Sequence, residues 1–232
     1  MKKYFWIAIV LALAAVGPNI FPAAQAGHST LPVLALRLLL PAVIGLTLLS
    51  AALWRSQRAT ARAVVWGALA GVLATIPLEV VRLIGFHFEF MPGNLPRLMG
   101  VLLLDRFAEG PSTASDIAGW AYHFWNGASF GIIYAVLLGT RRRWLGTLYG
   151  MLIGVGFMLS PVVTSLGVGY FGLQFSYGFP VTVGVAHLAF GVSLGILARC
   201  FLDGQGSAWS NAPAAACPCC FDFAHADSTR RV

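Results

Sequence analysis

The chain has 232 residues, of which 58% are hydrophobic and only 10% are charged. A soluble globular domain has about 25% charged residues, so this composition excludes an ordinary water-soluble fold. The net charge is +7, but the basic residues stand in short clusters between apolar runs, which favours orientation in a bilayer over nucleic-acid binding. We therefore expect a membrane protein whose main partner is lipid and which has no nucleic-acid partner.

The apolar runs are long enough to cross a bilayer. A helix needs roughly 20 mostly apolar residues to span the hydrocarbon layer. The candidate stretches lie at roughly 4–21, 33–53, 63–85, 118–140, 144–163 and 180–199. Because no water satisfies backbone groups at that depth, each is expected to be helical. The predicted fold is all-α, a polytopic transmembrane helical bundle of about six spans.

The first stretch has two interpretations. Lys2 and Lys3, the apolar run that follows and the small residues Ala24 and Ala26 also resemble a cleavable signal peptide. Pro18 is expected to limit the helix. Residues 1–26 are therefore either the first transmembrane segment or a signal peptide, and residues 27–202 form the transmembrane domain in both cases. Residues 203–232 are expected to be a disordered tail.

Basic clusters predict the orientation. They occupy alternate connections, and the connections at 22–32 and 164–179 carry no charged residue. The clusters are Lys2 and Lys3, then Arg55, Arg58 and Arg62, then Arg141 to Arg143, and finally Arg199. Six crossings place all of them on one side, which the positive-inside rule identifies as the cytoplasm. We expect a multi-pass protein of the bacterial inner membrane with a cytoplasmic C-terminus.

The later stretches contain an internal repeat. His123, Gly127 and Gly131 recur as His187, Gly191 and Gly195, and the stretches before them carry Gly67 and Gly71 or Gly146 and Gly150. Two related hairpins, 63–140 and 144–199, are therefore expected in a parallel duplication, since each contains two crossings. Glycines spaced by four share one helix face and predict close packing between helices.

Ionisable side chains within the stretches mark the candidate site, because each costs about 2.5–3.5 kcal/mol on membrane insertion. The candidate residues are Glu79, Arg82, His123, Asn126 and His187, and His87 is a further residue that can join them. Glu79 and Arg82 share a helix face and can pair. His123 and His187 are expected at similar depth. The competing interpretation is structural, with a neutralised ion pair and histidines that fix packing through hydrogen bonds.

Three functions remain open. The leading hypothesis is a non-enzymatic protein that binds or transports a small solute or ion through the candidate site. The alternative is a redox or sensing protein in which the imidazoles bind a metal or ligate haem. The third is a structural assembly partner. The sequence leaves open whether the chain forms a homo-oligomer.

The tail contains a separate cluster of potential ligands, Cys217, Cys219, Cys220 and His225. Closely spaced thiolates can bind a soft metal ion. No second cysteine pair completes a closed four-ligand site, so an adventitious tail is the competing interpretation.

Two phrases carry a resemblance. Ala121 to Gly127, continuing to Gly131 and Tyr134, and Ala186 to Gly191 resemble helices of small multi-pass bacterial membrane proteins of unknown function, which have paired His-x3-Gly-x3-Gly helices. The resemblance covers roughly residues 63–199 and implies no particular activity.

Overall fold

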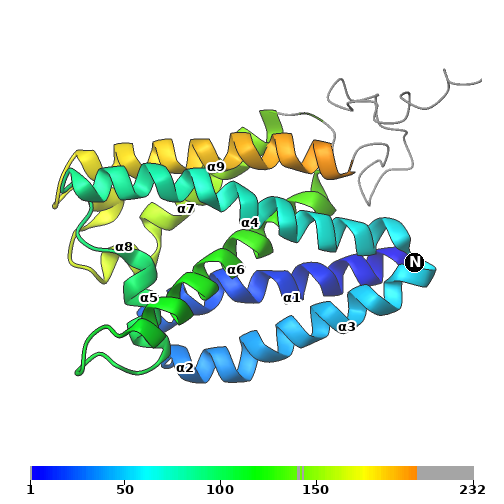
Figure 1. The fold of residues 1–232 in the computed structure, drawn as a ribbon, viewed down its shortest axis with the longest axis horizontal. Coiled ribbons are helices and arrows are strands. Elements are labelled where there is room, and N and C mark those ends of the chain that lie inside the picture. Colours follow the sequence, from blue (N-terminus) through cyan, green and yellow to red (C-terminus); the bar gives the residue numbers. More distant parts are fainter. Residues whose placement is uncertain (1, 140–141, 143, 203–232) are drawn as a thin grey trace, which may run out of the picture.

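The protein is described here by a computed structural model, which covers residues 2–139, 142 and 144–202. In this part of the chain the structure is helical and has no strand. Six long helices run alternately in opposite directions (Figure 1): α1 (Lys2–Gln25), α3 (Leu40–Ser56), α4 (Arg58–His87), α6 (Thr113–Leu137), α7 (Trp144–Leu159) and α9 (Gly178–Leu202). The predicted all-α bundle is confirmed.

Short elements connect the long helices. They are α2 (Leu31–Leu34), a π-helical turn (Ala35–Leu39), α5 (Leu95–Leu103), α8 (Pro161–Thr164) and a 3-10 turn (Tyr170–Gly172). The π turn joins α2 to α3, and there the Leu40 N–H donates to the carbonyl of Ala35. This wider turn precedes Pro41, which has no N–H to donate.

The helices have the length and composition of membrane spans. Among the described residues five segments qualify, namely Lys3–Gln25, Leu31–Ser56, Arg58–His87, Trp144–Thr164 and Gly178–Leu202. Apolar side chains on their outer faces are exposed, among them Leu36 (67%), Leu48 (66%) and Val181 (65%). Lipid is the solvent that suits such a surface. The chain is therefore a membrane-embedded protein.

The sixth long helix, α6, is not among those five segments. It has 25 residues and packs against α1 and α4 within the bundle. Asp116, His123 and Asn126 lower its hydropathy, and the last two belong to the candidate site described below. The helix that composition identifies least clearly thus carries two polar residues of the site.

The first helix is longer than predicted. It continues through Pro18 and Pro22 to Gln25, so the expectation that Pro18 limits it is wrong. A proline removes one backbone hydrogen bond, but neighbouring helices in a membrane can compensate for this loss. Here α6 adds a hydrogen bond beside Pro18, because the Tyr122 hydroxyl donates to the carbonyl of Gly17 at 2.7 Å. Ile7 and Val10 of the same helix belong to the main buried core.

Both predicted hairpins have the same glycine register. The contacts are Gly67 with Gly131 and Gly71 with Gly127 between α4 and α6, and Gly146 with Gly195 and Gly150 with Gly191 between α7 and α9. A Cβ at most of these positions would overlap the facing backbone. The two hairpins run in the same direction (Figure 1), as a parallel duplication requires. They differ in their neighbours, because α4 packs extensively against both α6 and α9.

The segment between α4 and α6 covers one end of the bundle. Its helix α5 packs tightly on α6. Gly100 permits this approach, since a Cβ there would overlap the carbonyl of Ser115. Met91 and Met99 of this segment are buried. A capping box between Ser112 and Ser115 starts α6.

Candidate functional site

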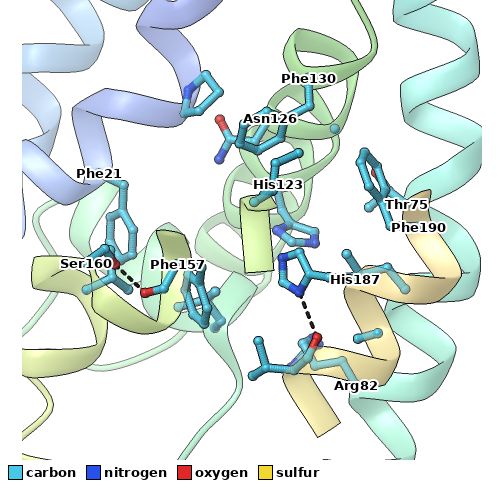
Figure 2. Close-up of a pocket in the computed structure, with 18 of the residues that line it drawn as sticks. Phe21, Thr75, Arg82, His123, Asn126, Phe130, Phe157, Ser160, His187 and Phe190 are labelled. Carbon is cyan, nitrogen blue, oxygen red and sulfur yellow. Dashed lines mark hydrogen bonds between the residues drawn. The ribbon is translucent and has the colours of Figure 1, made fainter. Parts of the chain in front are cut away.

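A cavity of about 420 Å³ lies between α1, α4, α6, α7 and α9. It occupies the half of the bundle toward the C-terminal ends of α1 and α4, opposite the N-terminus. Four predicted residues line it, namely Arg82, His123, Asn126 and His187. Figure 2 shows these side chains directed toward the same space from three different helices. The fifth, Glu79, contacts two of them from behind the cavity wall.

Glu79 and Arg82 form a buried ion pair on α4. Arg82 Nε lies 2.8 Å from both carboxylate oxygens of Glu79, and Arg82 Nη2 lies 2.6 Å from Glu79 Oε2. The two side chains are only 5% and 6% exposed. The predicted pairing of these two residues is thus present in the structure. A spacing of three residues brings the two side chains onto one face of the helix.

The other groups around Arg82 leave one of its nitrogens free. Nη2 also donates to Asn94 Oδ1 at 3.4 Å, and the guanidinium carbon lies 5.9 Å from the centre of the Trp120 ring. Nη1 is buried and has no hydrogen-bond partner among the described residues. A buried donor without a partner is costly, because a charged group forfeits more than a neutral one. This donor belongs to a residue that lines the cavity.

His123 extends the ion pair toward α6. Its Nε2 lies 2.8 Å from Glu79 Oε1, and its side chain is 13% exposed. The ring is not aligned for a good hydrogen bond, so Nε2 also lacks a well-formed partner in the described structure. The glycine crossing explains the short distance. Gly71 and Gly127 let α4 and α6 approach, which places the next turns, with Glu79 and His123, side by side.

His187 comes from the second half of the repeat. Its Nδ1 lies 2.8 Å from the carbonyl oxygen of Val183, and a carbonyl can only accept, so Nδ1 carries the proton. The neutral ring then keeps a lone pair on Nε2. Gly154 makes room for the ring, because a Cβ there would lie 2.9 Å from His187 Cβ and Cγ. Phe157 stacks on the ring with centroids 6.1 Å apart.

Most of the remaining wall is apolar. Asn126 is an exception, since its Oδ1 is buried without a hydrogen-bond partner among the described residues. The apolar lining includes Phe21, Leu78, Phe130, Ile153, Phe157 and Phe190. The arrangement therefore has a polar wall with unused hydrogen-bonding groups and a larger apolar wall. Such a cavity suits a small molecule with one polar end.

Other predicted residues lie elsewhere. His87 is exposed at the end of α4 and lines a separate surface depression with Glu89 and Phe175, so it does not join the site. Cys217, Cys219, Cys220 and His225 lie outside the described residues. Within the described chain, no three His, Cys, Asp or Glu side chains are placed to bind a metal ion.

The structure adds residues that the sequence did not reveal. Asn94 and Trp120 contact Arg82, while Pro18 and Phe21 of α1 complete the wall. Asn94 lies between α4 and α5, and Pro18 and Phe21 belong to α1, which is remote in sequence from the other site residues. None of these three residues had a local sequence pattern that indicated the site.

The surface carries a second ion pair, outside the cavity. Arg97 of α5 donates to Asp116 from Nε at 3.1 Å and from Nη2 at 3.0 Å. The hydrogen bond and the charge of Asp116 raise the pKa of Arg97. Because Arg97 is well exposed, this ion pair contributes little to the stability of the protein.

No protein-family model, curated protein or solved structure matches this chain.

Proposed function

We propose that this protein is a non-enzymatic solute-binding protein of the bacterial inner membrane, and that it binds a small molecule in the cavity between α1, α4, α6, α7 and α9. One observation carries the proposal. Arg82, His123, Asn126 and His187, from three helices, converge on a cavity of about 420 Å³, and the first three of these residues each have a buried polar atom without a hydrogen-bond partner in the described structure. Ligand pockets of about 300–1,000 Å³ with few polar groups are typical of small-molecule sites.

The position of the basic residues supports the inner membrane and the orientation. Arg55 and Arg58 flank the connection between α3 and α4, and Arg199 lies near the end of α9. These points lie toward the same end of the bundle as the N-terminus (Figure 1). The positive-inside rule places that end in the cytoplasm. The cavity then opens within the outer half of the membrane, and the C-terminus is cytoplasmic.

A cavity-filling variant tests the proposal. Gly156 lines the cavity, and an added Cβ would meet no atom within 4 Å, so Gly156→Leu fills space without a backbone clash. Gly184→Leu is the matched control, because Gly184 also has no neighbour within 4 Å and does not line the cavity. The probes are radiolabelled dodecanoate and dodecanol, measured by equilibrium binding to protein in nanodiscs relative to empty nanodiscs.

We expect the unmodified protein and Gly184→Leu to bind at least one probe in excess of empty nanodiscs. Gly156→Leu should lose most of that excess, since its side chain obstructs the cavity at an exposed part of the lining. Excess binding that is the same in all three proteins, or absent from all three, would contradict the proposal.

A second candidate function follows from the imidazoles. The His123 and His187 rings lie near one another in Figure 2, and the protonation of His187 at Nδ1 leaves Nε2 able to ligate a metal or haem iron. Stoichiometric metal by elemental analysis, or a Soret band that disappears in His187→Ala, would support this function instead of solute binding.

A further inference from the structure

We infer that the ligand is an amphiphile from the bilayer, with a single apolar chain and an oxyanion head that binds Arg82 Nη1 and the His123 ring. This inference rests on the proposed function and specifies the class of solute. Three features of the cavity support it: the free cationic donor, the apolar wall and the side on which the cavity is open.

The free donor selects the head group. Arg82 is 95% buried at its side chain, as the 5% exposure shows, and Nη1 lacks a partner in the described part of the chain. An oxyanion is the group that a guanidinium binds best, because charge-assisted hydrogen bonds are about twice as strong as neutral ones. The His123 ring lines the same cavity beside this ion pair, with Nε2 turned toward Glu79. A head at Arg82 Nη1 can therefore also contact the His123 ring.

The charge of the site is compatible with such a head. The charges of Glu79 and Arg82 from α4 cancel, and the other titratable groups at the site are the imidazoles of His123 from α6 and His187 from α9. An oxyanion adds one negative charge, which a buried site does not tolerate uncompensated. The nearest cation is Arg82, which would bind the head through Nη1 while its Nε and Nη2 hold Glu79.

The cavity is closed toward water. Met91, Leu95 and Met99 of the segment between α4 and α6 line its outer end, and Met91 and Met99 are only 7% and 5% exposed. Asn94 of the same segment is hydrogen-bonded to Arg82. This segment separates the polar wall from the aqueous side.

Toward the lipid the cavity is open. Of its lining residues, Asn19 of α1 and Gly156 of α7 are exposed. Leu152 and Leu159, one turn on either side of Gly156, are 62% and 47% exposed on the lipid-facing surface of α7. Among the described helices, α7 packs mainly against α9 and makes no substantial contact with α1. A ligand that enters between α1 and α7 comes from the acyl-chain region, so its body must be apolar.

The same two probes test the head group, and the unmodified protein suffices for the first arm. Dodecanoate and dodecanol have the same chain, so a difference in their excess binding reports the head alone. We expect dodecanoate to bind about tenfold more tightly, as one charge-assisted hydrogen bond to a buried arginine predicts. Equal binding of both probes would overturn this inference, although it would leave solute binding intact.

The second arm removes the charge without leaving a charged group buried alone. Glu79→Gln combined with Arg82→Gln keeps polar side chains of similar size, and Arg97→Gln is the matched control at the exposed pair. We expect the double variant to bind both probes alike and Arg97→Gln to retain the preference for dodecanoate. A preference that survives in the double variant would contradict the role of Arg82.

The third arm identifies the source of the ligand. Acetate carries the same head without the chain, and it reaches the protein from water. We expect excess acetate to leave dodecanoate binding unchanged, because the outer end is closed. Displacement of dodecanoate by millimolar acetate would show a site for water-soluble carboxylates instead.

Discussion

A single arginine makes this cavity polar. Arg82 uses Nε and Nη2 for Glu79 and Asn94 and leaves Nη1 without a partner in the described structure. Ion pairs in a membrane interior usually reflect either structure or function, and the sequence alone cannot separate the two. The free donor distinguishes them here, because a purely structural pair would gain stability by satisfying it.

Loss of one partner of this pair should cost more than loss of both charges. Arg82→Gln leaves the Glu79 carboxylate buried beside His123 alone, and such a change costs about 3–5 kcal/mol. The double variant Glu79→Gln, Arg82→Gln leaves no buried charge and should be clearly more stable than Arg82→Gln. Thermal unfolding of purified protein in detergent measures both. A double variant less stable than Arg82→Gln would show that the pair itself stabilises the fold.

Helix crossings position the site residues. The glycine contacts of the first half bring His123 next to Glu79, and those of the second half place His187 against Gly154. Small residues allow such approach in membranes, where no hydrophobic effect drives helices together. The repeat therefore determines the depth of both histidines, while the different neighbours of α4 and α7 give the two imidazoles different partners.

An added methyl group at the first crossing should separate the helices. A Cβ at Gly71 would overlap the backbone carbonyl of Gly127, and backbone cannot move aside as a side chain can. We expect Gly71→Ala to lower the free energy of unfolding by about 2 kcal/mol, a typical cost of overpacking. Gly184→Ala, in open space, should not destabilise the protein. Equal melting temperatures of the two variants would contradict the close crossing.

At the scale of the molecule, the orientation decides which compartment the closed end faces. The segment that covers the cavity lies opposite the N-terminus in Figure 1, and the orientation that we propose from the positive-inside rule puts this segment outside the cell. The first helix also belongs to the folded domain, because Phe21 and Pro18 line the cavity. A cleaved signal peptide would remove that wall.

Labelling of single cysteines tests this orientation. With the four native cysteines replaced by serine, Gly93→Cys and Ser56→Cys place one exposed thiol at each end of the bundle. We expect an impermeant maleimide to label Gly93→Cys in intact cells, and Ser56→Cys only after permeabilisation. The reverse pattern would place the basic connections outside. The intact mass of the same samples reports whether residues 1–26 are retained.

The sequence by itself determined the solvent, the helices and the candidate residues. Long apolar runs can satisfy their backbone in lipid only as helices, and polar residues such as Glu79 and His123 are conspicuous in them because each is costly there. Glycine spacing also predicted the duplicated hairpin. The close packing of two helices depends on small residues spaced by four along each helix, and this spacing is visible in the sequence.

Only the tertiary structure decided what those residues form together. Long-range packing, which no local pattern encodes, brings α1 to the cavity, places Asn94 on Arg82 and opens the wall between Asn19 and Gly156. It also carries α1 past Pro18, beside which Tyr122 of a distant helix donates to the carbonyl of Gly17. The sequence identifies the polar groups that are costly to place in the membrane. The fold determines which of these groups form hydrogen bonds within the protein and which remain available to a ligand.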